Sequence, residues 1–396
     1  MFPTDIVIVA GARTPMARYT GSFSEVSAID LGVHASKEAI RRSGIDPEEF
    51  DHAIFGNVLQ TSADAIYGAR HVALKAGLSV STPAVTVNRL CGSGIESIAQ
   101  AAQRLLLGEA NVVLAGGMEN MTQAPFVIRG ARTGLKLGGG VLEDFLFVGL
   151  TDSYCGMPMA LTAEKLAEQA GITRKDSDSY ALRSQQAAEN ASKAGYFSEE
   201  IVPVEVKQGR KTVLVSEDDH RRPETTLETL EKLPPSFKKD GMVTAGNASG
   251  IVDGAAAVVL TRERTARERG WKTLGKITAW AVAGVDPTIM GIGPVPSTRK
   301  ALELAGLKLE QIDRVEVNEA FASQYLAVEK ELGLQRDKTN VNGGAIALGH
   351  PLGASGTRLV ITLLNELRRK NLRYGLATAC IGGGQGIAMI VEAVED

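Results

Sequence analysis

A weak internal repeat constrains the fold of this chain more than any other feature. Residues 37–57 read as a helix, a glycine that ends it, a short loop and a strand, and residues 300–319 read the same way. Gly44 superposes on Gly306 when the two stretches are aligned. Because this period is far longer than that of a solenoid repeat, the pattern predicts a duplicated domain.

The correspondence continues beyond these two stretches. It pairs Asp51 with Asp313, residues 86–88 with 340–342, Ser93-Gly94 with Ser355-Gly356, and the strand at 112–117 with residues 376–380. Alternating strands and helices, together with 43 glycines, favour α/β packing with tight turns. Two α/β halves related by a pseudo-twofold axis would bring loops from equivalent strand ends to one central site.

Residues 119–248 have no counterpart in the repeat, and we interpret them as an insertion that covers the mouth of the site. The predicted division is an N-terminal half of residues 1–118 plus 249–270, this insertion, and a C-terminal half of residues 271–396. The linker between the halves is expected near residues 262–273, which are charged and start no hydrophobic run.

Composition argues against several classes of protein. The chain of 396 residues is 44% hydrophobic and 22% charged, as soluble globular proteins are, and its net charge of −3 favours neither nucleic acid nor membranes as partners. No apolar run approaches the roughly 18 residues of a membrane-spanning helix. The N-terminus begins with a predicted strand at residues 6–10 in place of a signal-peptide pattern. Three cysteines argue against a disulfide framework and for a reducing compartment, and no metal site is predicted.

Cys91 lies between a strand at residues 84–87 and a run of apolar residues at helical spacing. This places its thiol at a helix N-terminus, where the partial positive charge favours thiolate over thiol. Gly92 and Gly94 would let a substrate approach the backbone closely. A buried structural cysteine is the alternative, but the glycine-flanked turn favours a nucleophile.

His350 is one of five histidines and lies in a glycine-rich loop that Pro351 closes. A backbone of this kind is suited to presenting an imidazole. If it lies near Cys91, a neutral histidine could take the thiol proton and activate the sulfur. A capping or packing histidine is the alternative.

Cys380 ends a strand and precedes three glycines at residues 382–384. Such a turn exposes backbone N–H groups, that of Gly382 among them, which can form an oxyanion hole. The thiol itself can exchange a proton with a carbon acid. A nucleotide-binding loop is disfavoured because no Gly-Lys-Ser/Thr follows. Cys155 has neither a helix start nor a glycine triplet, and we interpret it as structural.

Asn318 and Glu319 follow a strand at residues 315–317 and precede a helix predicted over residues 323–332. Polar residues at such a strand end occupy a site position in open α/β folds. A helix N-cap by Asn318 is the alternative. Both can hold if Asn318 also fixes a water that donates to an oxyanion.

Four motifs resemble those of the thiolase family, and the resemblance extends over essentially the whole chain. They are Asn88-Arg89-Leu90-Cys91-Gly92-Ser93-Gly94, Asn318-Glu319-Ala320-Phe321-Ala322, Gly349-His350-Pro351 with Gly353-Ala354-Ser355-Gly356, and Cys380-Ile381-Gly382-Gly383-Gly384. The resemblance implies a five-layered αβαβα duplicated fold with an inserted loop domain that binds coenzyme A, assembled as a homotetramer or homodimer. It also implies that Cys91 is acylated, that His350 and Cys380 handle protons, and that coenzyme A is a substrate rather than a cofactor.

The resemblance further implies contacts with coenzyme A. Arg222 would meet its adenine or phosphate end. Apolar and methionine walls suit the thin pantetheine arm, and the residues implied for its tunnel are Met159, Ala245, Ala248, Ser249, Met290 and Phe321.

Pro158 bears on the range of substrates. Short-chain acetoacetyl-type thiolases carry a histidine before the tunnel methionine, and a proline cannot fill its polar role. Residues 157–164, 233–241 and 291–296 are more similar to the mitochondrial 3-ketoacyl-CoA type. The resemblance therefore implies a broad 3-ketoacyl range that includes acetoacetyl-CoA.

The implied function is that of a ping-pong acyltransferase of lipid metabolism. It would cleave a 3-ketoacyl-CoA with coenzyme A into acetyl-CoA and a shortened acyl-CoA, or run the reverse Claisen condensation, through acyl-Cys91. The alternatives are a strictly short-chain acetoacetyl-CoA thiolase, a condensing enzyme of the ketoacyl synthase type, which pairs its cysteine with two histidines, and a non-catalytic lipid carrier, which needs no reactive thiol. The expected location is the bacterial cytoplasm or, as second choice, the mitochondrial matrix.

Overall fold

A computed structural model describes residues 4–394 of the chain. Within this part, one mixed sheet of ten strands forms the frame of the molecule. In sheet order its strands are β14 (Arg314–Val317), β15 (Tyr374–Ile381), β16 (Gln385–Ala393), β13 (Gly275–Gly284), β1 (Ile6–Arg13), β12 (Val252–Arg262), β5 (Val112–Glu119), β3 (His52–Gly56) and β4 (Ala84–Val87), with β2 (Ala17–Arg18) paired to β12.

Counted outwards from the β1–β13 pair, the strands follow the same order of antiparallel and parallel pairing in both directions, which confirms the predicted duplication. β5 pairs with β3 in parallel and with β12 antiparallel, and β15 pairs with β14 and β16 in the same two senses. His52 lies opposite Val113 and Arg314 lies opposite Gly375. The structure therefore aligns Val113 with Gly375, so the alignment of residues 112–117 with 376–380 was wrong by two positions.

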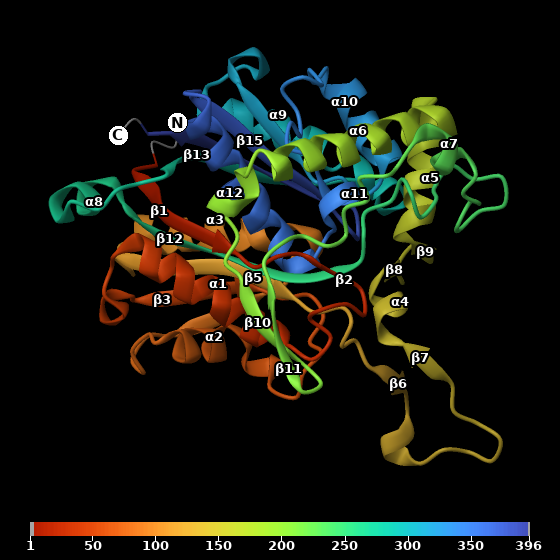
Figure 1. The fold of residues 1–396 in the computed structure, drawn as a ribbon, viewed down its shortest axis with the longest axis horizontal. Helices are drawn as coiled ribbons and strands as arrows, with labels where there is room; N and C mark the ends of the chain where they lie inside the picture. The colour runs from red at the N-terminus through yellow and green to blue at the C-terminus, as the bar shows by residue number, and fades with distance from the viewer. Residues whose placement is uncertain (1–3, 395–396) are drawn as a thin grey trace.

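Helices separate and cover the strands of the two halves in five layers (Figure 1). α3 (Ser93–Leu106) and α12 (Leu352–Arg369) pack against each other in the middle and share one apolar core with strands of both halves. α1 (Ala28–Ser43) and α2 (Gly68–Ala76) cover the N-terminal strands. α9 (Pro294–Ala305) and α10 (Ala322–Leu332) cover the C-terminal strands. The expected αβαβα layering is confirmed.

The amino-acid sequence explains these layers through two periods. Along β12 successive side chains point to opposite faces, so one core takes Ala256, Val258 and Leu260 while the other takes Ala255, Ala257 and Val259. Gly44 and Gly306 end α1 and α9 with φ of 68° and 67°, a conformation that favours glycine.

The segment between β5 and β12 carries a further set of elements on one side of the molecule. They are β6 (Phe126–Ile128), β7 (Leu142–Asp144), α4 (Phe145–Gly149), β8 (Thr151–Asp152), β9 (Met157–Pro158), α5 (Met159–Ala170), α6 (Arg174–Lys193), β10 (Val204–Gln208), β11 (Lys211–Val215) and α7 (Leu227–Glu231). The β6–β7 hairpin projects from the body of the molecule (Figure 1). Buried Glu319 anchors α6 to the C-terminal half, because it accepts hydrogen bonds from Tyr180 Oη at 2.7 Å and Ser184 Oγ at 2.6 Å.

The residues expected to form a linker include a helix, α8 (Glu263–Arg269), because ion pairs between Glu263 and Arg267 and between Arg264 and Glu268 lie one turn apart along it. Short helical turns complete the chain, and they are η1 (Pro47–Glu49), η2 (Ala65–Tyr67), η3 (Leu90–Gly92), η4 (Ala131–Thr133), η5 (Tyr196–Glu199), η6 (Pro287–Ile292), η7 (Leu309–Gln311) and α11 (Ala345–Leu348). Over residues 4–394, each helix is too short or too polar to cross a membrane.

Candidate active site

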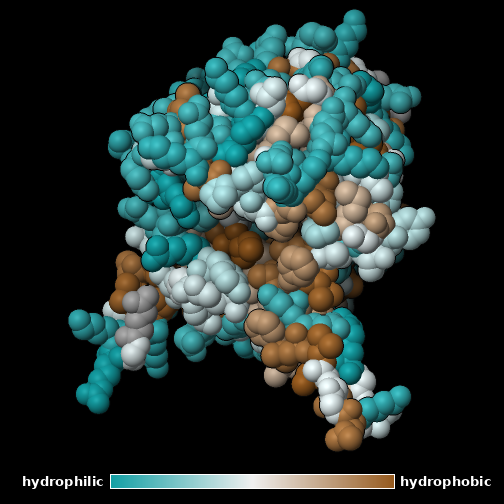
Figure 2. Space-filling view, turned by 90° about the vertical axis from the view of Figure 1, so that its right-hand side faces the viewer, coloured by the Kyte–Doolittle hydropathy of each residue, from teal (hydrophilic) through white to brown (hydrophobic). Residues whose placement is uncertain are grey.

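An apolar cavity of about 210 Å³ brings Cys91 and His350 together from opposite halves. Hydrophobic side chains gather in a hollow on the face of the molecule that carries α4 and α5 (Figure 2). Five of the residues implied for the pantetheine tunnel line the same cavity, namely Met159, Ala248, Ser249, Met290 and Phe321.

Cys91 lies in η3, directly after β4 and before α3, as the sequence predicts. Burial raises the pKa of its thiol to about 11, while hydrogen bonds from the backbone N–H groups of Gly382 and of Cys91 itself lower it. The carboxylate of Glu119 acts in the same direction as burial. The prediction that the helix start favours a thiolate is therefore wrong, because the cost of burying the charge exceeds the gain from the backbone.

His350 lies between α11 and α12, and its ring is held by Ser355. Nδ1 lies 2.5 Å from Ser355 Oγ, and Ser355 Oγ donates its one hydrogen to the carbonyl oxygen of Pro351 at 3.0 Å. The tautomer with its hydrogen on Nδ1 satisfies these contacts together, because Ser355 Oγ can then accept from Nδ1–H while Nε2 keeps a lone pair that faces Asn318 Nδ2. Burial, together with the charge of Arg358, lowers the pKa of His350 to about 3. The imidazole is therefore neutral at pH 7 and can act as a base.

Asn318 follows β14 and lies against the same imidazole. Its Nδ2 is 3.3 Å from Nε2 of His350. Its buried Oδ1 accepts no hydrogen bond from the described residues 4–394. The helix-cap alternative is wrong, because α10 begins at Ala322 with Phe321 at the cap position. A buried acceptor without a partner in the described chain is suited to holding a water.

Cys380 ends β15 and is fully buried, packed against Met290 and Ala320 behind the lining of the cavity. Burial raises the pKa of its thiol well above the usual range, and the neighbouring Cys91 raises it further. Cys380 is therefore in the thiol form near pH 7, the form that a proton donor requires.

Gly382 connects the Cys380 loop to Cys91, because its N–H donates to the sulfur of that residue. A Cβ at this position would lie 3.1 Å from Met159 Sδ and 3.2 Å from Leu90 Cδ1. The loop then turns through Gly383 and Gly384, with φ of 78° and 81°, which explains the run of glycines.

Arg222 and Ala245 lie apart from the five tunnel residues. They line a second cavity of about 200 Å³, together with His220 and Glu224. Burial and the charge of Arg222 lower the pKa of His220 to about 4, so His220 is neutral near pH 7.

The sequence analysis assigned no role to several residues at or near the site. Ser355 was matched to Ser93 in the repeat but given no role, and its place five residues after His350 was the available signal. Glu119 is the last residue of β5, and Asn318 is the first residue after β14, so a polar residue at a strand end was the available signal in both cases. The remaining wall of the cavity includes Met121, Phe147, Leu150, Phe237 and Leu352, for which no sequence signal existed.

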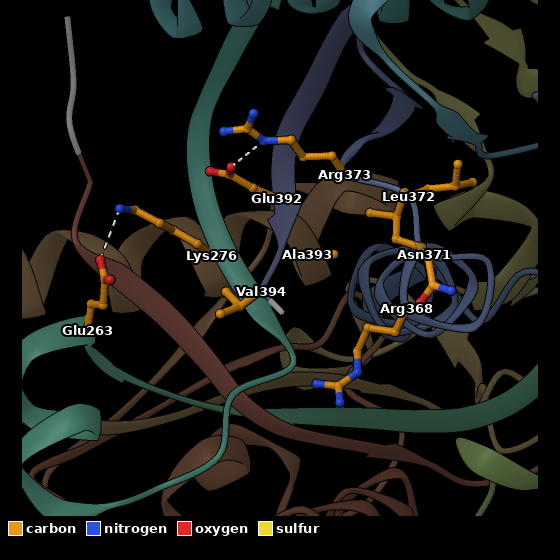
Figure 3. A pocket seen from close by; sticks show the side chains of 10 residues that line it. Glu263, Lys276, Arg368, Asn371, Leu372, Arg373, Glu392, Ala393 and Val394 are labelled. Atoms are coloured by element: carbon orange, nitrogen blue, oxygen red, sulfur yellow. Dashed lines mark hydrogen bonds and ion pairs between the residues drawn. The ribbon is translucent and has the colours of Figure 1, made fainter. Parts of the chain in front are cut away.

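A larger cavity, of about 840 Å³, lies away from the two thiols beside the end of the described chain at Val394 (Figure 3). Four of its charged residues form two ion pairs, since Lys276 Nζ lies 3.0 Å from Glu263 and Arg373 Nε lies 2.7 Å from Glu392. This cavity holds neither a cysteine nor a histidine in its lining.

Comparison with known proteins agrees with this geometry. A family model for the thiolase N-terminal domain matches residues 6–264, and one for the thiolase C-terminal domain matches residues 271–393. The chain is 53% identical to human mitochondrial 3-ketoacyl-CoA thiolase and 49% identical to an acetyl-CoA acetyltransferase of Escherichia coli, with 98% of each chain covered in both cases. A crystal structure of the human mitochondrial enzyme in complex with CoA matches with a TM-score of 0.96 over 98% of each chain.

Proposed function

The chain belongs to the thiolase family, and from this premise we propose that Cys91 carries the acyl group while His350 and Cys380 move protons. The activity is that of a thiolase, an acyltransferase that uses coenzyme A as a substrate and needs no cofactor. The proposal is supported above all by one observation: Cys91 and His350 come from opposite halves of the chain and line one apolar cavity.

In the cleavage direction, Nε2 of His350 takes the proton of Cys91, and the sulfur attacks the 3-keto carbon of a 3-ketoacyl-CoA. The C2–C3 bond then breaks, and the acetyl-CoA enolate takes a proton from Cys380. Coenzyme A attacks acyl-Cys91, its thiol proton replaces the one that Cys380 gave up, and His350 returns its proton to Cys91. Condensation runs the same steps in reverse, with Cys380 removing the α-proton.

Two sites can stabilise the negative oxygens that form on the way. The first is Nε2–H of protonated His350 with a water held by Asn318, and the second is the pair of backbone N–H groups of Cys91 and Gly382. Once Cys91 is acylated, the N–H of Gly382 is free to face the thioester oxygen. Each donor is expected to contribute about 2.7–4 kcal/mol to transition-state stabilisation.

We propose that coenzyme A enters through the cavity of Met159, Met290 and Phe321 and that Arg222 holds its adenine or phosphate end. A similar protein that was crystallised in complex with CoA supports CoA as the ligand. Residues 119–248 would then form the CoA-binding insertion between halves at 1–118 plus 249–270 and at 271–396. We further propose a homotetramer or homodimer, in the bacterial cytoplasm or, as second choice, the mitochondrial matrix.

The acyl range is proposed to be broad, because apolar Pro158 lines the cavity and the chain is 53% identical to a 3-ketoacyl-CoA thiolase. A strictly short-chain acetoacetyl-CoA thiolase is the second candidate, which the 49% identity to acetyl-CoA acetyltransferases favours. Thiolysis rates for 3-ketoacyl-CoAs of increasing chain length separate the two. A preference of more than about 100-fold for the four-carbon substrate would favour the second candidate.

Mass spectrometry after incubation with acetyl-CoA tests the central step. One acetyl group is expected on the peptide that contains Cys91. Its absence, or an acetyl group on Cys155 instead, would contradict the proposed function. Decarboxylation of malonyl-thioester would instead indicate a ketoacyl-synthase-type enzyme, and failure of acetyl-CoA to protect any cysteine from iodoacetamide would indicate a carrier.

A further inference from the structure

Glu119 is fully buried at the end of β5, and its carboxylate joins the two halves. Both of its oxygens accept hydrogen bonds, and the donors are Gly353 N–H at 2.8 Å, Leu59 N–H at 2.9 Å, Val58 N–H at 3.1 Å and Asn57 Nδ2 at 3.1 Å. Three donors belong to the loop after β3 in the N-terminal half, and the fourth belongs to the loop of His350 in the C-terminal half.

The contact with Gly353 serves the helix that starts beside His350. α12 begins at Leu352, and Pro351 at its cap position makes no side-chain cap hydrogen bond. A carboxylate of the other half supplies the missing acceptor, at the end of the helix where a negative charge is favourable. Glu119 therefore fixes the first turn of α12 at Gly353, three residues after His350.

The space around this contact leaves little freedom. A Cβ on Gly353 would lie 2.7 Å from the carbonyl oxygen of Met118, 2.9 Å from that of Gly56 and 3.1 Å from Oε2 of Glu119. Leu352 packs in one apolar cluster with Leu59 and Cys91. A shift of Glu119 would consequently move both the His350 loop and the wall of the cavity beside the nucleophile.

We propose that Glu119 is a positioning residue, which holds His350 and the cavity wall at Leu352 in register with Cys91. This inference rests on the proposed function, in which His350 takes the proton of Cys91. Glu119 touches neither the imidazole nor the substrate cavity, so it acts through the backbone of residues 350–353 and 57–59.

The charge of Glu119 adds a second effect. Burial raises its own pKa to about 7, its backbone donors lower it, and Asp253 of β12 raises it further. In its charged form it opposes ionisation of Cys91, which also has Cys380 as a titratable neighbour and shares its cavity with His350. Deprotonation of Cys91 is thereby left to His350 rather than occurring at rest.

The test replaces the carboxylate by an amide. In Glu119→Gln one oxygen becomes an NH₂ group, which can accept nothing, so two of the four donors lose their acceptor. We expect kcat for thiolysis to fall about 10–100-fold through misplacement of His350. The KM for coenzyme A should stay within about twofold, since no donor of Glu119 lines either cavity. The pH midpoint of Cys91 alkylation by iodoacetamide should move to lower pH, because a negative charge is lost.

Glu366→Gln is the matched control. Glu366 is buried near the other end of α12, roughly 20 Å from its start, where it accepts hydrogen bonds from Arg369 at 2.7 Å and Asn342 at 3.2 Å. This variant should lower the melting temperature and leave the alkylation midpoint unchanged. If Glu119→Gln behaves like Glu366→Gln, or keeps normal kcat, the positioning role is wrong.

Glu119→Asp keeps the charge but shortens the reach between the two loops. We expect a lower kcat with an unchanged alkylation midpoint, and an unchanged kcat would overturn the proposal even if Glu119→Gln does not fold. Failure of the proposed function is distinguishable, because wild-type protein would then form no acyl-Cys91, whereas the alkylation midpoint does not depend on turnover.

Discussion

The two halves of the molecule hold different side chains at equivalent places. The same shift of 262 residues relates Asp51 to Asp313 and Ser93 to Ser355, and the strand register relates Val113 to Gly375. By this shift Cys91 corresponds to Gly353 and Cys380 corresponds to Met118. The N-terminal half thus carries the thiol of Cys91 where the C-terminal half has a glycine, and the C-terminal half carries the thiol of Cys380 where the N-terminal half has a methionine.

The duplication therefore places the same backbone elements in both halves, whereas the reactive side chains at equivalent positions differ. In each half the end of a strand lies beside the start of a helix. Of these two helix starts, the one in the N-terminal half carries a thiol, that of Cys91. At the other, Glu119 accepts the N–H of Gly353 and serves as a clamp. The active site is therefore shared, and its precision depends on how the halves are held together.

Among the variants that test this comparison, Cys91→Ala should have the largest effect on thiolysis. Without the thiol, both halves have a small inert residue at the helix start. We expect no acyl-enzyme and a loss of thiolysis on the order of 10⁴–10⁶-fold, measured by mass spectrometry and by the rate of 3-ketoacyl-CoA cleavage. An acetylated variant would show that the nucleophile lies elsewhere.

Cys380→Ala should separate the two thiols. Its nucleophile is intact, so acetyl-CoA should still acylate Cys91, but exchange of the α-protons of acetyl-CoA with deuterated water should fall about 10²–10⁴-fold. Cys155→Ala, which removes the third thiol, should leave both readouts unchanged. Normal proton exchange in the Cys380 variant would contradict the role given to that residue.

The paired serines sharpen the comparison on a smaller scale. Ser355 Oγ lies 2.5 Å from Nδ1 of His350, whereas the hydrogen bonds of Ser93 within residues 4–394 go to backbone, accepting from Arg89 N–H at 2.8 Å and donating to the carbonyl oxygen of Leu90 at 2.7 Å. Ser355→Ala should lower kcat about 10–100-fold, because Nδ1 loses its hydrogen-bond partner and Nε2 is no longer held as the proton acceptor.

Ser93→Ala provides the matched control for this pair, because it removes the same hydroxyl from the equivalent turn. It should cost about 1 kcal/mol of unfolding free energy and change kcat less than Ser355→Ala, as measured by denaturant unfolding and steady-state kinetics. Equal losses of kcat would mean that the hydroxyl of Ser355 supports the turn rather than the imidazole.

The sequence could predict much of this architecture because its signals are local. Gly44 and Gly306 mark helix ends by their own backbone conformation, and Cys91 follows a strand and precedes a helix through patterns within a dozen residues. The role of Ser355 and the contacts of Glu119 depend on which side chain faces which across the two halves. The pKa of Cys91 depends on all the atoms that exclude water from it, so the helix-start argument alone gave the wrong direction.

The pH profile offers the smallest but most general test, since the two halves contribute groups that titrate at opposite ends of the scale. His350, with a pKa of about 3, stays neutral as the pH falls, and Cys91, with a pKa of about 11, stays a thiol as it rises. The reactive pair is thus in its working form throughout the range between these values, and kcat/KM should vary by less than about threefold from pH 6 to 9. Had the helix start favoured a thiolate, a thiolate–imidazolium pair would give a bell-shaped profile with both limbs near neutrality. A one-proton limb between pH 5 and 8 that persists in Glu119→Gln would therefore contradict the neutral pair, whereas a limb that disappears in that variant would report Glu119 itself, whose pKa is about 7.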